Sequence, residues 1–269
     1  MKKKKSGTRE WSERSANCRF GCAHGCIYCY GRAARFNGKR GEDWAREEIK
    51  AVSARSLRRA PGVVMFPTLH DVTPENMHVV LPMLWKLLAA GNEVLWVSKP
   101  HQVVVATVVE RLKREVQWWS KISMRFTIGS TDSGTLKLWE PGAPCFEERL
   151  MCLALAARSG LPTSASCEPL LVPSSAAYLV TKLAPHVTDD RPEGGIWIGK
   201  LNHARARCAW YLKAHPEFAM WLKALEEWQT DEAVEDVYRE LTELPPGVAR
   251  KLRWKDSYRE ALARRGVSL

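Results

Sequence analysis

The stretch from Cys22 to Cys29 holds the residues of this 269-residue chain that are best suited to chemistry. It reads Cys-Ala-His-Gly-Cys-Ile-Tyr-Cys, so its three thiols have the spacing Cys-x3-Cys-x2-Cys. Gly21 and Gly25 allow the backbone to fold closely around whatever the sulfurs hold. Soft thiolate ligands select iron–sulfur clusters, zinc or Cu(I). Three thiolates would leave one iron of a [4Fe–4S] cluster open, and we expect chemistry at that position.

A structural zinc site is the alternative for these thiols, because Cys18 supplies a fourth. Zinc sites more often use two short cysteine pairs separated by a longer spacer. The spacing therefore favours an iron–sulfur cluster held by Cys22, Cys26 and Cys29, with Cys18 outside it. Of the remaining cysteines, Cys152 and Cys208 are expected in the core. Cys145 and Cys167 are expected near the site, where each could be either a core residue or a functional one.

The net charge of +11 is concentrated at one end of the chain. Residues 1–60 contain 16 Lys and Arg against 6 Asp and Glu, whereas the remainder is nearly balanced at 25 against 24. Such a positive segment attracts a polyanion such as nucleic acid, although a solubilising tail would look the same. No apolar run reaches the roughly 18 residues of a membrane span, and no apolar stretch follows Lys2–Lys5 as in a secretory signal. We therefore expect a cytoplasmic protein with no membrane contact and reduced cysteines.

Short apolar runs alternate with helical segments after Pro61-Gly62. Strands are predicted at 63–66, 93–97, 122–128, 162–167 and 196–198, and helices at 73–90, 101–118, 146–159 and 174–185. The repeat is close to the ~30 residues of one βαβ unit. With a first strand before Cys18, the pattern gives six β/α repeats. The fold class predicted is α/β, a partial (β/α)6 TIM-type barrel with a C-terminal helical extension.

Three segments are expected along the chain: a basic N-terminal tail over 1–14, the partial barrel over 15–203 and a helical extension over 204–269. A helix is predicted at 42–60, with its acidic residues first and its basic residues last. The extension is predicted to form helices at 204–213, 216–229, 231–243 and 250–265. Its packing face is expected to consist of Trp210, Trp221, Trp228, Leu222 and Leu225.

Polar residues recur where the predicted strands end. Ligands of parallel β/α folds bind beyond the carboxyl ends of the strands. Any one of these residues alone could be a helix cap, but their recurrence after five strands predicts a single mouth shared with the cysteine loop. They are Thr68, His70, Asp71, Ser98, Lys99, Ser130, Thr131, Asp132, Glu168, Lys200, Asn202 and His203.

The cysteine motif, with the aromatic Tyr28 before its last cysteine, resembles that of the radical S-adenosylmethionine (SAM) enzymes. The resemblance implies a partial (β/α)6 barrel in which the three cysteines hold a [4Fe–4S] cluster. It also implies that the open iron binds the amino and carboxylate groups of SAM. Reductive cleavage of SAM then yields a 5′-deoxyadenosyl radical that abstracts hydrogen from a substrate. A reductant such as flavodoxin or ferredoxin would supply the electron.

Within that superfamily, most of residues 15–200 resemble spore photoproduct lyase and its relatives, the radical SAM DNA repair photolyases. The likeness is carried by Cys26–Tyr30, by Arg125–Ser130, by Glu140-Pro141-Gly142 and by Arg149. It implies Cys22, Cys26 and Cys29 as cluster ligands. Residues expected to contact SAM are Tyr28, Thr68, Lys99, Ser130 and Glu168. Among these, a lysine suits the SAM carboxylate.

Two departures from the family pattern affect the reading of the site. Pro67-Thr68-Leu69-His70-Asp71 stands where the family has Gly-Gly-Glu, which leaves the contact to the SAM amino group unassigned. The lyases also carry a hydrogen-donating cysteine in that stretch, and this chain has none there. Tyr30 matches a tyrosine of the lyase radical relay. Tyr30, His70 and Asp71 are therefore the candidate catalytic residues, the last two for hydrogen bonding or proton transfer.

The function predicted is a radical SAM enzyme of the photolyase-like branch that acts on a nucleic acid or nucleotide, in repair or base modification. Two alternatives stay open. One is a radical SAM enzyme for a small molecule or peptide, whose basic segment is only solubilising. The other is a non-catalytic, metal-stabilised nucleic-acid-binding protein. A monomer is expected.

Overall fold

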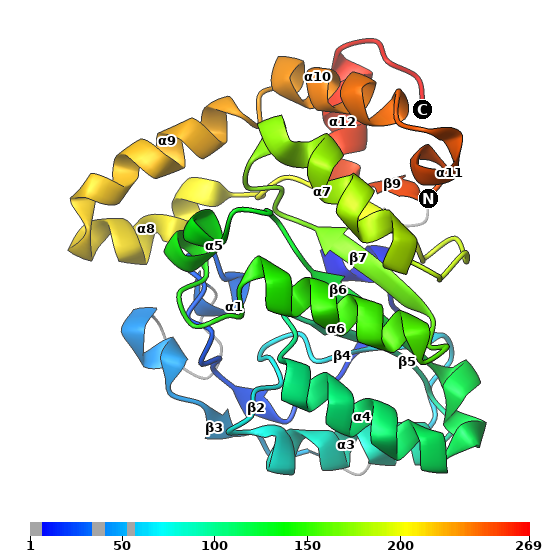
Figure 1. Ribbon diagram of the computed structural model, residues 1–269. Coiled ribbons are helices and arrows are strands. Elements are labelled where there is room, and N and C mark those ends of the chain that lie inside the picture. The colour runs from blue at the N-terminus through cyan, green and yellow to red at the C-terminus, as the bar shows by residue number, and fades with distance from the viewer. Residues whose placement is uncertain (1–6, 34–40, 53–56) are drawn as a thin grey trace.

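The computed structural model describes residues 7–33, 41–52 and 57–269 (Figure 1). Its centre is a seven-stranded sheet in the order β1-β4-β5-β6-β7-β8-β9, and every neighbouring pair in it is parallel. The strands are β1 Arg14–Ser15, β4 Val63–Phe66, β5 Glu93–Ser98, β6 Ile122–Thr127, β7 Thr163–Cys167, β8 Ile196–Ile198 and β9 Leu252–Trp254. Each crossover advances the sheet by one strand, as in a β/α barrel. In the described part of the chain no pairing joins β1 to β9, so the barrel is partial.

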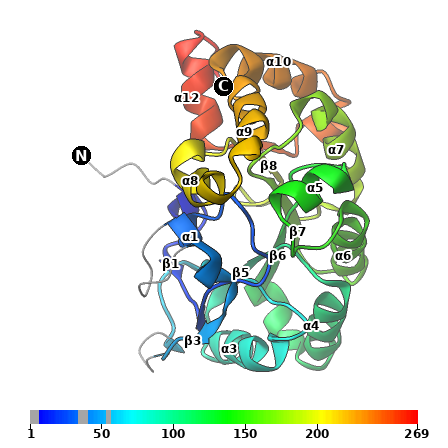
Figure 2. The same cartoon turned by 90° about the vertical axis from the view of Figure 1, so that its left-hand side faces the viewer.

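The helices lie outside the curved sheet, and Figure 2 shows α3, α4, α6 and α7 as an arc around it. The longer helices are α3 Met77–Ala89, α4 Gln102–Arg114, α5 Ser133–Trp139, α6 Phe146–Arg158, α7 Ala176–Leu183, α8 Ala204–Ala214, α9 Ala219–Glu227, α10 Asp231–Thr242 and α12 Asp256–Arg264. The one-turn helices are α1 Tyr30–Ala33 and α11 Pro246–Ala249. A small antiparallel pair, β2 Arg19–Phe20 and β3 Glu48–Ile49, lies apart from the main sheet.

Burial explains the alternation seen in the sequence. Strand β7 is buried along its whole length, and β6 is buried except at its last residue, as expected where helices cover one face and the barrel interior lies on the other. Helix α4 turns Val104, Val105, Val108, Val109 and Leu112 toward the sheet, which is the apolar stripe of an amphipathic helix. The same stripes make one continuous core of strands and helices.

The predicted fold class is confirmed, and the five strands predicted from 63 to 198 are found with bounds that differ by at most one residue. The helix predicted at 42–60 is wrong where the chain is described: Gly41–Ala45 is a 3-10 turn and Glu48–Ile49 is strand β3. Residues 53–56 lie outside the described residues. The helix predicted at 250–265 begins as strand β9 and becomes helical only at Asp256. This strand pairs with β8 and adds a seventh strand to the sheet.

The start of the described chain enters the barrel. A 3-10 turn, η1 Gly7–Glu10, leads to Trp11, which is 6% exposed and packs against Met65, Leu95 and Trp197 on the inner face of the sheet. This inner cluster is separate from the main core. Part of the segment expected as a basic tail therefore lines the barrel interior.

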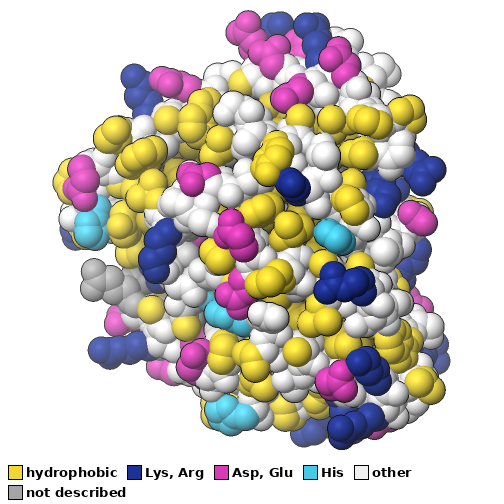
Figure 3. Space-filling model, in the orientation of Figure 1, with side chains coloured by type: hydrophobic (Ala, Val, Ile, Leu, Met, Phe, Trp, Pro, Cys, Tyr) yellow, Lys and Arg dark blue, Asp and Glu magenta, His cyan; other side chains and the backbone are white. Residues whose placement is uncertain are grey.

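The last third of the chain is mainly helical and covers one end of the sheet. Leu222 and Leu225 are buried as expected, but Trp221 and Trp228 are 45% and 39% exposed, so the predicted packing face is only partly buried. Figure 3 shows hydrophobic side chains gathered over the region of α8 and α9. The division of the chain at residue 203 stays a prediction. Among the described residues, no helix has the length and apolar character needed to cross a membrane.

Candidate active site

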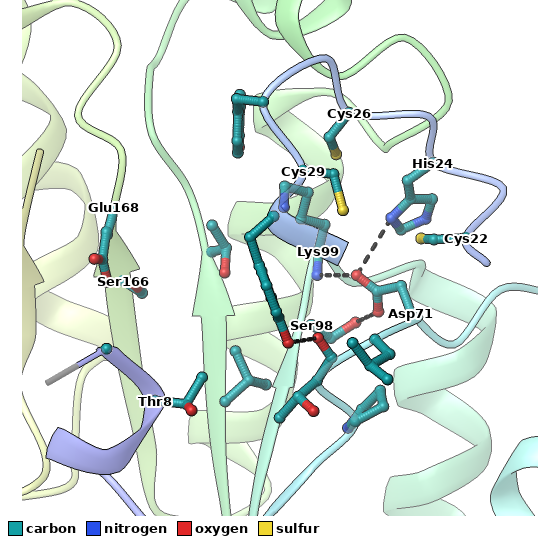
Figure 4. Close-up of a pocket in the computed structure, with 18 of the residues that line it drawn as sticks. Thr8, Cys22, His24, Cys26, Cys29, Asp71, Ser98, Lys99, Ser166 and Glu168 are labelled. Carbon is teal, nitrogen blue, oxygen red and sulfur yellow. Dashed lines mark hydrogen bonds and ion pairs between the residues drawn. The ribbon is translucent and has the colours of Figure 1, made fainter. Parts of the chain in front are cut away.

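One cavity of about 710 Å³ lies at the carboxyl ends of the strands. Figure 4 shows its two sides. The cysteine wall carries Cys22, His24, Cys26, Cys29, Asp71 and Lys99; across from it lie Thr8, Ser166 and Glu168. Of the residues predicted as cluster ligands, SAM contacts or catalytic groups, all but Ser130 line this cavity: Cys22, Cys26, Cys29, Tyr28, Tyr30, Thr68, His70, Asp71, Lys99 and Glu168. Of the other polar residues predicted at the same mouth, Ser98 and Lys200 line the cavity, whereas Thr131, Asp132, Asn202 and His203 do not.

The cysteine loop is held by backbone contacts that leave no room for side chains. Gly21 has φ +94°, and a Cβ there would lie 2.6 Å from the carbonyl oxygen of Arg46. The amide of Cys22 donates to the carbonyl of Trp44 at 2.8 Å. Gly25 has φ +64°, which also favours glycine. The expectation that these two glycines fold the loop tightly agrees with the geometry.

The segment after α5 supports the other side of the same loop. The amide of Gly142 donates to His24 O at 2.8 Å, and that of Ile27 donates to Trp139 O at 2.9 Å. A Cβ on Gly142 would lie 2.5 Å from the carbonyl oxygen of Ala23. The indole of Trp210 on α8 donates to Ile27 O at 3.0 Å. Three segments that are distant in sequence thus fix the positions of the thiols.

Asp71 is the most heavily bonded carboxylate of the cysteine wall. It accepts from the amides of Val72 and Lys99, both at 2.8 Å, and from the Ser98 hydroxyl. Its Oδ2 lies 3.2 Å from Nδ1 of His24. Burial favours a higher pKa for Asp71, but the charge of His24 and the hydrogen bonds outweigh it and lower the pKa to about 2. Asp71 is therefore a fixed anion behind the cysteine loop.

His24 was not singled out from the sequence, yet it connects two parts of the site. Its side chain is buried, and its Nε2 lies 2.9 Å from Nε2 of His101. Two nitrogens at that distance share one proton, so one ring donates and the other accepts. His101 lies 3.8 Å from Glu148 at the half-exposed start of α6. A histidine between two cluster-type cysteines was the available signal.

His70 is occupied by the protein backbone. Its Nε2 accepts from the amide of Cys18 at 3.3 Å, and its Nδ1 donates to the carbonyl of Asp71 at 3.2 Å. This pattern assigns a neutral ring with its proton on Nδ1. Burial lowers the pKa of His70 to about 4. The Cys18 thiol is 3.8 Å from the same Nε2 and does not line the cavity. Its place outside the cluster stays a prediction.

A buried charge cluster lies under Lys99. Glu140, which is fully buried, pairs with Arg149 at 2.5 Å and accepts from the Tyr28 hydroxyl. The Lys99 Nζ lies 3.9 Å from Glu140 Oε1 and 5.6 Å from the centre of the Tyr28 ring. Burial opposes the charge of Lys99, but Cys26 and Glu140 raise its pKa, so Lys99 stays protonated at the cavity surface.

Tyr30 and Thr68 meet at the entrance to the same wall. The Tyr30 hydroxyl donates to the Thr68 carbonyl at 2.5 Å, and Asn17 accepts from the amides of Thr68 and Leu69 at 2.7 Å. Burial raises the pKa of Tyr30 to about 12. Its phenol therefore stays protonated at neutral pH and retains an O–H bond that faces the cavity lining.

Ser130 differs from the other predicted residues because it turns into its own loop. Its hydroxyl accepts from the amide of Asp132 at 2.9 Å, and Asp132 caps α5 by accepting from Gly134 and Thr135. Among the lining residues, β6 contributes Thr127 instead. The role of Ser130 in binding SAM stays a prediction, and the present contacts are those of a helix cap.

The side of the cavity opposite the cysteines is built from distant segments, none of which the cysteine pattern could indicate. Lys255, at the start of α12, lies 2.8 Å from Glu10 and 3.5 Å from Glu168, and its Nζ is 3.9 Å from the centre of the Trp11 ring. Burial raises the pKa of Glu168, partly opposed by Lys255. Arg9, Lys200 and Arg207 also line the cavity. We call the cavity lining from Thr8, Arg9, Ser166, Glu168, Lys200 and Arg207 the far wall.

The three thiols of the cysteine wall are candidate ligands for a cluster, and this assignment stays a prediction. Among the described residues no three His, Cys, Asp or Glu side chains converge closely enough to hold one metal ion. A [4Fe–4S] cluster places each cysteine on a different iron, so its ligands need not converge on one point. Burial raises the pKa of Cys26 to about 12. A bound metal reverses this, because a coordinating thiol is deprotonated.

No protein-family model matches this chain, and no curated protein matches it. Solved structures do match. A double mutant of spore photoproduct lyase with bound AdoMet and dinucleoside spore photoproduct has a TM-score of 0.52 at 17% identity, over 73% of this chain and 60% of that one. The lyase complexed with dinucleoside spore photoproduct has a TM-score of 0.50, also at 17% identity, over 69% and 55%.

These comparisons confirm at the level of fold the resemblance predicted from the sequence. The architecture is that of a partial β/α barrel like that of spore photoproduct lyase, a radical SAM enzyme. This chain spans only about 55–60% of the length of the structures that it matches. The identity is low, so the likeness describes the fold, and the chemistry must be argued from the site.

Proposed function

We propose that this chain is a radical SAM enzyme that acts on a nucleic acid or nucleotide, in repair or base modification. The observation that supports this most directly is the joint placement of Cys22, Cys26 and Cys29 in one cavity at the carboxyl ends of a partial barrel. In this proposal the three thiolates hold a [4Fe–4S] cluster and the same cavity binds SAM. The cluster, once reduced, would supply the electron that cleaves SAM and so starts hydrogen abstraction.

The residues around the thiols have roles that follow from their contacts. Lys99, held protonated beside Glu140, offers its ammonium group to the SAM carboxylate. Tyr28 is fixed by Glu140 and presents its ring to the cavity, where it can lie against the adenine. Tyr30 keeps its O–H bond and is the candidate for hydrogen transfer. His70 and Asp71 are saturated by protein groups, so we assign them a positioning role rather than a chemical one.

The nucleic-acid part of the proposal rests on two further observations. The first 60 residues carry the chain's excess of positive charge, and several cations line the far wall. The structures matched in fold include complexes with dinucleoside spore photoproduct. This chain has no cysteine in the stretch 67–71. The proposal is therefore a related hydrogen abstraction, not the lyase reaction itself.

The first test is cluster assembly. Anaerobic reconstitution with iron and sulfide should give a brown protein with a [4Fe–4S] signal by electron paramagnetic resonance after reduction. Cys22→Ala, Cys26→Ala and Cys29→Ala should each lose most of the bound iron. Cys18→Ala is the matched control, because that thiol contacts His70 outside the cavity, and it should keep its iron. Equal iron loss in Cys18→Ala would contradict the assignment of three ligands.

The second test is SAM cleavage. With dithionite and SAM, the reconstituted protein should release 5′-deoxyadenosine, and release should rise when single-stranded or duplex DNA is added. A colourless protein that binds one zinc ion and leaves SAM intact would favour the nucleic-acid-binding alternative. Cleavage that DNA neither stimulates nor inhibits, together with no DNA binding at low salt, would favour a small-molecule or peptide substrate.

A further inference from the structure

Three cations on the far wall have no side-chain partner among the residues that the structure describes. The side chains of Arg9, Lys200 and Arg207 line the cavity, yet none makes a hydrogen bond or ion pair with another residue that the structure describes. Most charged groups on the cysteine wall are paired: Asp71 with His24, and Glu140 with Arg149 and Lys99. Unpaired cations inside a cavity indicate a ligand that brings negative charge.

These cations are carried by segments that the protein ties together. Lys255 Nζ donates to the Gly7 carbonyl at 3.1 Å, and Glu10 accepts from the Asp256 amide at 3.3 Å, so η1 is fixed to the start of α12. The Lys200 amide donates to Ser257 Oγ at 3.2 Å, which fixes the loop after β8 to the same place. Arg9 and Lys200 therefore project from neighbouring, anchored segments.

Arg207 approaches from a different element, the first turn of α8. It lines the same cavity as Glu168 of the far wall and Tyr30 of the cysteine side. The carboxylates nearby do not neutralise the group. Glu168 and Glu10 both pair with Lys255, and this leaves the other three cations facing the cavity.

SAM does not account for this charge. Its amino acid part is a zwitterion, and the cysteine wall already supplies Lys99 for the single carboxylate. We propose that Arg9, Lys200 and Arg207 form a phosphate-binding subsite that holds the backbone phosphates of a nucleotide substrate. This inference rests on the proposed function, and it makes the substrate a phosphorylated nucleotide or polynucleotide rather than a free base or nucleoside. Arginine forks bind phosphate oxygens through paired hydrogen bonds, and lysine binds them as a point charge.

Binding should be measured on the reconstituted protein by fluorescence anisotropy, with a fluorescein-labelled, random-sequence single-stranded DNA 10-mer as probe. Arg9→Gln, Lys200→Gln and Arg207→Gln should each weaken binding about tenfold at low salt, the size of one charge-assisted hydrogen bond. Each variant should also reduce the slope of log affinity against log salt by about 0.7. Thermal melting of each variant checks that it folds; because the three residues lie on different elements, one unstable variant leaves two others to decide.

Arg205→Gln is the matched control. Arg205 lies on the same helix as Arg207, but its side chain is 72% exposed and pairs with Glu226. The Arg205→Gln substitution removes the same formal charge without removing a cavity contact, so the affinity for the DNA probe should stay within about twofold of that of the parent protein. If Arg205→Gln weakens binding as much as the three cavity variants, attraction is a general surface effect and the subsite does not exist. Unchanged affinity in the three cavity variants would overturn it equally.

Competition distinguishes the two sources of phosphate. If a mixture of deoxynucleoside 5′-monophosphates displaces the probe and the nucleosides do not, the subsite serves a mononucleotide. If only unlabelled oligonucleotide displaces it, the subsite serves a polynucleotide. Displacement by nucleosides as effective as by nucleotides would contradict the subsite. The binding result is independent of SAM cleavage, so a protein that binds the probe through these cations but never cleaves SAM would refute the proposed function and keep the subsite.

Discussion

The two sides of the cavity treat charge in opposite ways. On the cysteine wall, the described side chains are paired with one another: Asp71 accepts from two amides and faces His24, and Glu140 lies among Arg149, Lys99 and Tyr28. Behind the far wall, Lys255 pairs with the carboxylates of Glu10 and Glu168. The far-wall cations Arg9, Lys200 and Arg207 face the cavity without side-chain partners among the described residues.

The difference indicates which side of the cavity is preorganised in the absence of a ligand. A closed network of charges fixes geometry, and a fixed geometry is what thiols need if they are to hold a cluster in one orientation. Unpaired cations contribute little to a fixed geometry, but they retain their full attraction for an anion. We infer that the cysteine wall is preorganised for cofactors and that the far wall gains its order from the substrate.

The largest effect is expected from Glu140→Gln. The substitution removes the anion that pairs with the fully buried Arg149 and lies 3.9 Å from Lys99, and leaving a buried charge such as that of Arg149 uncompensated costs about 3–5 kcal/mol. Denaturant unfolding of the cluster-free protein measures this loss. The matched control is Asp231→Asn, which breaks the exposed pair with Arg264 at 2.6 Å and should leave the free energy of unfolding nearly unchanged. Equal losses in the two variants would mean that the buried network is not what holds the cysteine wall.

The next effect is expected from Gly142→Ala. Its new Cβ would meet the backbone of Ala23 and His24 at 2.5–3.0 Å, and backbone cannot move aside without displacing the cysteine loop. We expect a loss of stability near 3 kcal/mol, the upper end of the usual cost of overpacking. Iron bound per protein after reconstitution should fall as well. Gly247→Ala is the control, because nothing lies within 4 Å of its added Cβ. Full iron loading in Gly142→Ala would show that the loop tolerates displacement.

Much of the fold followed from the sequence because its signals are local. Each strand from β4 to β8 is an apolar run between turn residues, and the repeat length identified the parallel crossovers. Strand β9 was not predicted because it has only three residues, Leu252–Trp254, and these lie in a basic stretch of the sequence. It is defined by its pairing with β8, which the sequence does not show. The helix at 42–60 was predicted from the charges at its two ends, and this prediction was wrong. Trp44 is fully buried against the cysteine loop, so the chain there follows that loop instead of forming a helix.

The site divides in the same manner. The cysteines and the polar residues after the strands could be predicted because motif spacing and strand ends are local features of the sequence. Arg9, Arg207 and Lys255 come from three elements whose meeting depends on tertiary contacts, and no spacing links them. The same holds for the pairing of His24 with His101 across 77 positions. Sequence reasoning therefore identified the cysteine wall and missed most of the far wall.

The smallest effect concerns His70 and the pH dependence of stability. Its neutral ring uses both nitrogens, one donating to Asp71 O and one accepting from the Cys18 amide, so protonation would break the second bond. Burial lowers its pKa to about 4 in the folded state, against an ordinary value of 6.5. As pH falls below 6.5, the unfolded chain gains this proton and the folded one does not. Stability should therefore fall between pH 6.5 and pH 4, with no further loss from this group below pH 4.

Between pH 7 and pH 5 this group should cost about 2 kcal/mol, measured as the drop in the free energy of unfolding of the cluster-free protein. In His70→Gln that part of the drop should vanish, although stability at pH 7 will be lower because the amide cannot reproduce both bonds. His78→Gln, at an exposed position of α3, should keep the parent's pH dependence. A parent protein equally stable at pH 5 and pH 7 would mean that His70 accepts a proton in the folded state.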